Sequence, residues 1–170
     1  MSDWEIDYEF MLANEDRTQA HAVAPDAPPG AYAISGINSA AFPAEFAAIA
    51  AIPQAQRGPA VEAFYKAHES WQWLSQLTSD AVAERVLDAE VNGGVVPAVR
   101  MLQQAASSLG QTSGGDGAWG PNTVAAANSG DPSALVIAFD QARAAHYRAL
   151  VAANPALAQY EAAWLARAEE

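Results

Sequence analysis

The sequence predicts an all-α fold, for three reasons. Alanine, the residue with the highest helix propensity, dominates runs such as 47–51 and 125–127. Apolar residues recur at helical spacing through most of the chain, and prolines, glycines and capping residues stand where helices would begin and end. No convincing strand pattern competes with these signals, so we expect at most a short β-hairpin, in the loop after the first helix.

The first helix is expected over about residues 3–13. Apolar residues recur there at helical spacing, namely Trp4, Tyr8, Met11 and Leu12, and acidic residues at the start favour the positive end of a helix dipole. Glu15 then falls at or just past the helix end. Residues 17–43 are rich in proline, glycine and small side chains, which predicts a long structured loop with a short hairpin around 32–34.

Helical signals resume at Pro43 and continue nearly to the end of the chain. Proline suits the first turn of a helix, and Ser, Asp and Asn cap helix starts. On these grounds helices should begin near Pro43, Pro59, Ser79, Val95, Pro121, Asp131 and Asn154. Gly93-Gly94 and Gly110 should end two of them. His68, Trp71 and Trp73 are expected to share one helix and its exit.

Composition limits the possible function classes. The chain has 170 residues, enough for one domain with a hydrophobic core, and its 20 acidic and 8 basic residues give a net charge of −12. Such a chain offers no basic face for nucleic acid, and an anionic membrane would repel it. No apolar stretch is long enough for insertion across a bilayer.

The sequence shows neither the residue spacing of a metal site nor an ordinary export signal. There is no cysteine, and His21, His68 and His146 have no metal-ligand spacing, so neither a metal nor another cofactor is expected. The N-terminus shows no signal peptide. We therefore expect a protein made in the cytoplasm, which would act outside the membrane only after release or export by a non-classical or phage-type route.

Three separated segments together resemble a known family. Glu15 at the end of the first helix is followed by Asp-Ala-Pro-Pro-Gly at 26–30 and Ser-Gly-Ile-Asn at 35–38. The second segment is Leu-Asp-Ala-Glu-Val-Asn-Gly-Gly at 87–94, with Leu102-Gln103 after it. The third is Asp-Gly-Ala-Trp-Gly-Pro-Asn-Thr at 116–123, followed by Arg143, Tyr147, Trp164 and Arg167, which should lock the last two helices together.

The order and spacing of these segments, from about Tyr8 to Arg167, resemble glycoside hydrolase family 108, the N-acetylmuramidases of phage and bacterial lysins, with the peptidoglycan-binding region often fused to them. The resemblance implies a lysozyme-like single domain over residues 1–170. Its catalytic-type part would span about 8–92, and a peptidoglycan-binding-like helical part, about 93–168, would pack on it.

The resemblance also implies the site residues. Glu15 would be the catalytic acid, and Asp26 the second carboxylate, as base or nucleophile. Tyr32, Ser35, Asn38 and Asn92 would bind substrate. Each candidate also has an ordinary structural interpretation: Glu15 as a surface residue after a helix, Asp26 as a turn residue, and Asn92 as a helix C-cap. Trp119 is likewise either a core plug or a platform for a sugar ring.

Departures from the family pattern lie around Glu15. Asp16-Arg17 replaces two glycines, Ser35 stands at a tyrosine position, and Asn38 stands at a serine or threonine position. If Arg17 points to solvent, the cleft stays open. If its guanidinium forms a salt bridge with Glu15, that carboxylate becomes a poor proton donor.

The leading hypothesis is therefore a monomeric hydrolase that cuts the glycan strands of bacterial peptidoglycan. The alternative is a non-catalytic cell-wall-binding or secretion-assisting relative, which the altered residues after Glu15 and the acidic composition favour. An all-α adaptor without a glycan ligand would explain the helices but not the order of the motifs.

Overall fold

The computed structural model describes residues 2–68 and 70–168. Its helices are α1 (Trp4–Glu15), α2 (Pro43–Ala50), α3 (Gly58–His68), α4 (Trp71–Leu74), α5 (Asp80–Gly93), α6 (Val95–Ser108), α7 (Pro121–Ala127), α8 (Pro132–Ala153) and α9 (Ala158–Arg167), with short 3-10 turns at Gln54–Gln56 and Pro155–Leu157. The strands are β1 (Val23–Asp26), β2 (Ala31–Ile34) and β3 (Ile37–Asn38). The prediction of a mostly helical fold is confirmed.

The strands form one small antiparallel sheet in the order β1-β2-β3. It lies between the first two helices, within the loop where a hairpin was expected. Asp26 pairs with Ala31 next to the β1–β2 turn, and Ile34 pairs with Ile37 next to the β2–β3 turn. The third strand, of two residues, is the only addition to the expected hairpin in the described part of the chain.

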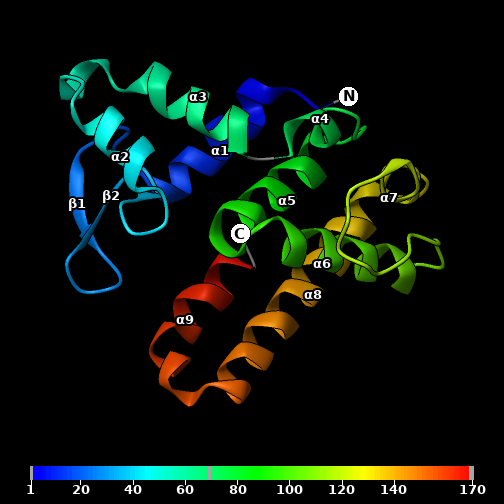
Figure 1. The fold of residues 1–170 in the computed structure, drawn as a ribbon. Helices are drawn as coiled ribbons and strands as arrows, with labels where there is room; N and C mark the ends of the chain where they lie inside the picture. Colours follow the sequence, from blue (N-terminus) through cyan, green and yellow to red (C-terminus); the bar gives the residue numbers. More distant parts are fainter. Residues whose placement is uncertain (1, 69, 169–170) are drawn as a thin grey trace.

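Helix α5 is the centre of the molecule (Figure 1). It packs against α1 on one side and against α6 and α8 on the other. The sheet lies with α2 and α3 at one end, and α8 and α9 form a helical hairpin that projects from the other (Figure 1). One hydrophobic core extends from α1 to α8, and a smaller cluster of Ala144, Tyr147 and Ala168, with Trp164 and Leu165, joins α8 to α9.

Local capping signals explain several helix boundaries. The Asp3 carboxylate accepts a hydrogen bond from the N–H of Glu5 at 2.9 Å, and Asp131 accepts one from Ser133 at 3.0 Å. Gly94, with φ of +89°, ends α5 in a conformation that favours glycine. These boundaries therefore follow from residues next to them in the chain.

Glu15 lies at the end of α1, as expected, although the helix runs slightly past residue 13, because the N–H of Asp16 still donates to the Leu12 carbonyl at 2.7 Å. Two other local expectations were wrong. Ser79 occupies the N-cap of α5, but its hydroxyl makes no capping hydrogen bond. Trp71 and Trp73 lie in the separate one-turn helix α4, whereas His68 ends α3.

Two further searches bear on function. Over residues 2–68 and 70–168, no helix is long and apolar enough to cross a membrane. In the same residues, no three or more histidine, cysteine or acidic side chains gather in a way that could hold a metal ion.

Candidate active site

Glu15, the last residue of α1, has a confined carboxylate. Its side chain is 15% exposed, and Oε1 accepts a hydrogen bond from Nη2 of Arg167 at the end of α9. The other oxygen, Oε2, faces Gly36: a Cβ there would lie 2.6 Å from Oε2 and 2.7 Å from the Tyr65 hydroxyl. The φ of Gly36 is +82°. Space and backbone conformation both require glycine beside Glu15.

Arg167 is itself anchored on Asp88, a buried residue of α5. Asp88 accepts hydrogen bonds from Nε of Arg167 at 3.1 Å and from its Nη2 at 2.6 Å, and it lies 2.6 Å from Nη2 of Arg143. The four residues Glu15, Asp88, Arg143 and Arg167 thus place two carboxylates against two guanidiniums. This network joins α1, α5, α8 and α9.

The same contacts shift two pKa values. Burial alone would raise the pKa of Asp88, but the hydrogen bonds and charge of Arg167, with the charge of Arg143, hold it below its ordinary value. Burial alone would lower the pKa of Arg167, but its hydrogen bonds to Asp88 and the charge of Glu15 raise it above its ordinary value. Asp88 and Arg167 therefore both stay charged over the ordinary pH range.

The network continues through amide and phenol groups. Asn14 donates from Nδ2 to Asp88 at 3.1 Å. Asn92 donates to the Tyr147 hydroxyl at 2.6 Å, and Nε of Arg143 donates to the same oxygen at 2.9 Å. Asn92 is therefore not the helix C-cap, a position that Gly94 takes.

The four residues expected to lock the last two helices together do more than that. Tyr147 stacks on Trp164, which joins α8 to α9, with 5.3 Å between ring centroids. Arg143 and Arg167 reach further, to Asp88 on α5, and Arg167 also reaches Glu15. The final helix is therefore tied to the first.

The two residues that follow Glu15 take no part in its ion pair. Arg17 is exposed and makes no salt bridge within the described residues, so the guanidinium that contacts Glu15 belongs to Arg167. Asp16 turns toward the sheet, where Oδ2 accepts hydrogen bonds from the Ser35 hydroxyl at 2.9 Å and the N–H of His21 at 2.7 Å. Arg17 therefore does not cover the Glu15 carboxylate with an ion pair.

Asp16 secures a strained part of the loop. Ser35 and His21 have φ values of +46° and +49°, a region that residues with side chains seldom adopt. Burial alone would raise the pKa of Asp16, but hydrogen bonds from Ser35, Thr18 and His21 lower it. Ser35 is 6% exposed, because its hydroxyl is directed to Asp16 and the ring of His21. The acid next to Glu15 therefore has a structural role.

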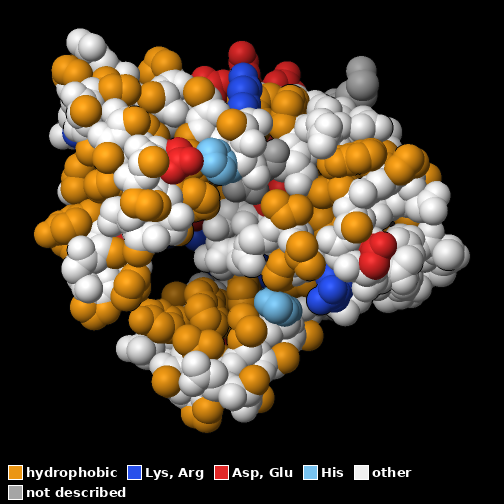
Figure 2. Space-filling model, viewed as in Figure 1, with side chains coloured by type: hydrophobic (Ala, Val, Ile, Leu, Met, Phe, Trp, Pro, Cys, Tyr) orange, Lys and Arg blue, Asp and Glu red, His pale blue; other side chains and the backbone are white. Residues whose placement is uncertain are grey.

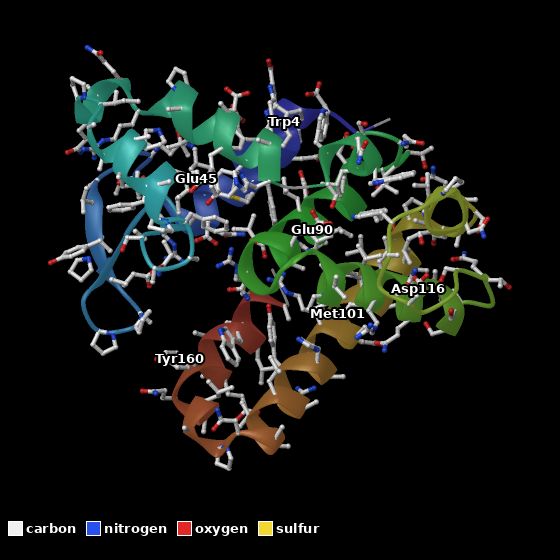
Figure 3. The ribbon with its side chains drawn as sticks, in the orientation of Figure 1. Trp4, Glu45, Glu90, Met101, Asp116 and Tyr160 are labelled. Carbon is white, nitrogen blue, oxygen red and sulfur yellow. The ribbon has the colours of Figure 1, made fainter. Side chains whose placement is uncertain are left out.

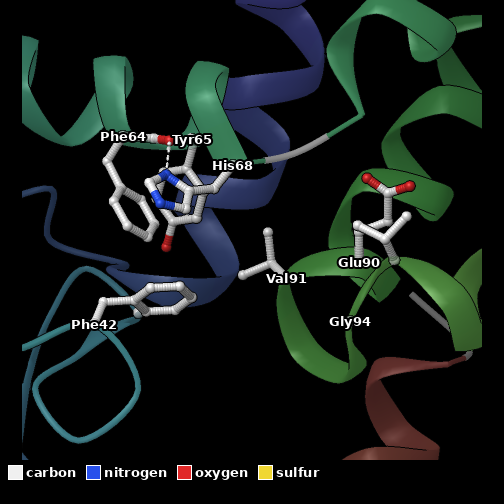
Figure 4. Close-up of a pocket in the computed structure, with 9 residues that line it drawn as sticks. Phe42, Phe64, Tyr65, His68, Glu90, Val91 and Gly94 are labelled. Atoms are coloured by element: carbon white, nitrogen blue, oxygen red, sulfur yellow. Dashed lines mark hydrogen bonds between the residues drawn. The ribbon is translucent and has the colours of Figure 1, made fainter. Parts of the chain in front are cut away.

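Two hollows adjoin Glu15. One, of about 310 Å³, lies between α3 and the end of α5; its walls include Gly36, Phe42, Tyr65, His68 and Val91 (Figure 4). The other, of about 370 Å³, lies between the ends of α1 and α5 and helix α9; its walls include Asn14, Arg17, Asn92, Trp164 and Arg167. Figure 2 shows the surface deeply hollowed between the sheet and the α8–α9 hairpin. Glu15 is itself a wall of neither hollow, but its carboxylate lies against Gly36, which lines the first, and Arg167, which lines the second.

The other predicted site residues on the sheet line neither hollow. Asp26 is exposed next to the β1–β2 turn, where its Oδ2 accepts a hydrogen bond from Nδ2 of Asn38 at 2.7 Å. Tyr32 is 48% exposed on β2. The substrate-binding roles of Tyr32, Ser35 and Asn38 stay predictions. So does the pairing of Asp26 with Glu15.

Trp119 has the contacts of a core plug. Its ring packs against the main core, and its Nε1 donates to Oε1 of Glu90 at 2.7 Å. Glu90 is 2% exposed and lies on α5 (Figure 3). The indole is thus held between apolar packing and a buried carboxylate.

Three residues join the site that the motifs did not assign to it: Gly36, Asp88 and Arg167. Gly36 and Asp88 fall inside the segments 35–38 and 87–94, so a signal for them was present. The pairing of Arg167 with Glu15 has no local signal, because 152 positions separate the two residues.

Part of the chain matches the model of a known family. The model of a family described as a predicted peptidoglycan domain matches residues 97–169, which include Arg143, Trp164 and Arg167. This match supports a peptidoglycan-related protein. A search of curated proteins finds no match.

Among solved structures, the chain is similar to SagA of Brucella abortus. The similarity covers 98% of this chain and 89% of that chain, with a TM-score of 0.68 and 18% sequence identity. At this identity the likeness shows the fold alone. The narrower resemblance to glycoside hydrolase family 108 stays a prediction.

Proposed function

We propose that the protein is a peptidoglycan hydrolase of the N-acetylmuramidase type, which cleaves the glycan backbone with Glu15 as the general acid. The position of the Glu15 carboxylate carries the proposal: it lies against Gly36 and Arg167, which line two hollows of about 310 and 370 Å³. Hollows of this size lie within the range of small-molecule sites. The family match over residues 97–169 supports peptidoglycan as the partner.

Glycosidic cleavage needs a carboxylic acid that donates a proton to the leaving oxygen. Oε1 of Glu15 is occupied by Arg167, so the proton would be delivered from Oε2. That oxygen faces Gly36, which has no side chain to cover it and which lines the hollow between α3 and α5. A leaving oxygen in that hollow would approach Glu15 from the side of Oε2, the oxygen that Arg167 does not contact.

Cleavage also needs a second group to activate water or to stabilise the sugar cation. Asp26 is our candidate, because its side chain is exposed at the end of β1, in the hairpin that follows α1. Asp16 is less suited, since Ser35, Thr18 and His21 already donate hydrogen bonds to it. A bound glycan strand would have to reach the hairpin for Asp26 to act.

The decisive experiment is digestion of purified sacculi, with released fragments analysed for new reducing ends. Wild-type protein should release fragments ending in N-acetylmuramic acid, and Glu15→Gln should abolish the release. Glu9→Gln is the matched control, because Glu9 lies on the same helix but is exposed. A rate that survives Glu15→Gln would refute the assignment, and Asp26→Asn tests the second carboxylate in the same assay.

The ion pair between Glu15 and Arg167 favours a second candidate, a non-catalytic protein that binds peptidoglycan. Arg167 occupies Oε1 of Glu15, so a substrate would have to displace this ion pair before both carboxylate oxygens were accessible to it. Sedimentation of the wild-type protein with sacculi, without any cleavage, would support this candidate over the hydrolase.

A further inference from the structure

The turn between β2 and β3 is held in a strained conformation. Ser35 and Gly36 connect the paired residues Ile34 and Ile37, with φ of +46° and +82°. Positive φ at both central positions is characteristic of a type I′ turn, which favours asparagine, aspartate or glycine at the first of them. Serine bears strain at that position, so its own contacts have to hold it there.

Those contacts come from Asp16, the residue that follows Glu15, and from His21. The Ser35 hydroxyl donates to Oδ2 of Asp16 at 2.9 Å and lies 2.8 Å from Nδ1 of His21. A hydroxyl has one proton, so Nδ1 of His21 is the donor in the second contact. The backbone N–H of His21 donates to the same Oδ2 at 2.7 Å. Asp16, Ser35 and His21 thus form a largely buried, hydrogen-bonded triangle.

This triangle fastens the turn beside the end of α1. Asp16 is bonded to Ser35, while its neighbour Glu15 packs against Gly36, where a Cβ would lie 2.6 Å from Oε2. Tyr65 of α3 holds the same turn through its backbone, since its hydroxyl donates to the Ser35 carbonyl at 2.6 Å. Its ring lies on the wall of the hollow that Gly36 also lines (Figure 4). The turn therefore cannot move away from Oε2 without breaking these hydrogen bonds.

We propose that Asp16 and Ser35 are positioning residues for Glu15. Arg167 fixes Oε1 of the Glu15 carboxylate by a hydrogen bond, and the turn that Asp16 and Ser35 hold fixes Oε2 by contact. The carboxylate then keeps one orientation, with Oε2 against Gly36. The strained turn thus serves the site as well as the sheet. The proposal rests on the proposed function, because it takes Glu15 as the acid.

Two substitutions of Ser35 separate positioning from stability. Both Ser35→Gly and Ser35→Ala remove the hydroxyl that bonds to Asp16. Glycine accepts the positive φ without strain, which opposes the loss of the hydrogen bonds, so Ser35→Gly should change Tm by less than about 5 °C. Alanine keeps the strain, so Ser35→Ala should unfold about 2–4 °C below Ser35→Gly. A positioning role predicts the same effect on Glu15 in both variants, whereas a structural role alone predicts an effect that follows Tm.

NMR of 13C-labelled protein tests the placement of Glu15 without any need for cleavage. The side-chain carboxyl signal of Glu15, identified by its loss in Glu15→Gln, should change its chemical shift to a similar extent in both Ser35 variants. Ser39→Gly is the matched control. Ser39 directly follows β3, and its hydroxyl accepts a hydrogen bond from the Tyr32 N–H at 2.9 Å. Within the described residues, that hydroxyl makes no hydrogen bond to Asp16 or Glu15, so the control should leave the Glu15 signal in place.

Cleavage of soluble glycan strands by the same variants gives a kinetic test. A catalytic group misplaced by about 1 Å can lose about 100-fold in rate. We expect both Ser35 variants to lower kcat by about 10- to 100-fold and to change KM by less than about 3-fold, because the contact that is lost matters in the transition state. Ser39→Gly should keep kcat and KM within about 2-fold of the wild type.

The outcomes separate this proposal from the hydrolase. A Glu15 signal that stays in place in both Ser35 variants would overturn the positioning role, whether or not the protein cleaves glycan. A change that follows Tm, or that Ser39→Gly reproduces, would also overturn it, because either result marks a general loosening of the hairpin. A wild-type protein that leaves glycan strands intact, with the Glu15 signal shifted in both variants, would refute the hydrolase and support the placement of Glu15 by Asp16 and Ser35.

Discussion

The buried carboxyl group of Asp7 should make the stability of the protein depend on pH in an unusual way. It lies on the buried face of α1 with no exposed surface, and neither carboxylate oxygen has a hydrogen-bond partner in the described residues. The nearby Ser2 hydroxyl donates to the Leu74 carbonyl instead, at 2.6 Å. Burial, with the negative charge of Asp80 next in size, raises the pKa of Asp7 from 3.8 to about 7.

A raised carboxyl pKa removes stability as pH rises. Below pH 3.8 the folded and unfolded chains both hold the proton, so Asp7 does not distinguish them. Between pH 3.8 and about 7 only the folded chain keeps it, and the free energy of unfolding falls. The shift of about 3 units, at about 1.4 kcal/mol each, corresponds to a loss of about 4 kcal/mol above pH 7.

Asp7→Asn removes the charge while keeping the shape of the side chain. We expect this variant to exceed the wild type in free energy of unfolding by up to about 4 kcal/mol at pH 8, or about 10 °C in Tm, and by far less at pH 4. Urea unfolding followed by tryptophan fluorescence at pH 4, 6 and 8 measures the difference. Glu9→Gln, at an exposed acid of the same helix, is the control. A difference between variant and wild type that does not change with pH would refute the reasoning.

Two further predictions concern the groove. Gly36→Ala should cost about 1–3 kcal/mol of stability and abolish cleavage, because the new Cβ would collide with Glu15 and Tyr65. Thermal unfolding measures the loss of stability, and sacculus digestion measures the loss of cleavage. Full activity would contradict the close approach of Gly36 to Glu15. Asp88→Asn should destabilise the fold by about 3–5 kcal/mol, because it leaves the buried guanidinium of Arg143 without the carboxylate that pairs with it. Arg167→Lys should lose less, since its charge is kept, and urea unfolding that places the two variants in the opposite order would contradict the network.

Local signals in the sequence were sufficient for the helical scaffold. Asp131 before Pro132 begins α8, and Gly94 ends α5, because capping and left-handed backbone involve only neighbouring residues. The hairpin was also predictable, from a loop rich in turn residues. The exact last residue of α1 was harder to predict. The last hydrogen bonds of a helix depend on packing against the rest of the protein, which the spacing of apolar residues does not specify.

The candidate site could be predicted only in part. Glu15 was chosen through the order of separated motifs, and its carboxylate lies against residues that line two hollows. Asp26 came from the same reasoning, yet it lines neither hollow beside Glu15. The departure at Arg17 left open whether that arginine pairs with Glu15; it does not, and the guanidinium that contacts Glu15 belongs to Arg167.

The sequence by itself determined the helical class and the position of the sheet in the loop after α1, because these depend on residues close together in the chain. Only the tertiary structure decided which charges meet. Arg167 reaches Glu15 across 152 positions because α9 folds back over α5 and both side chains converge near Asp88. The burial of Asp7 is of the same kind. Ion pairs and burial depend on distances in space, and no periodicity or spacing along the chain specifies which distant residue arrives there.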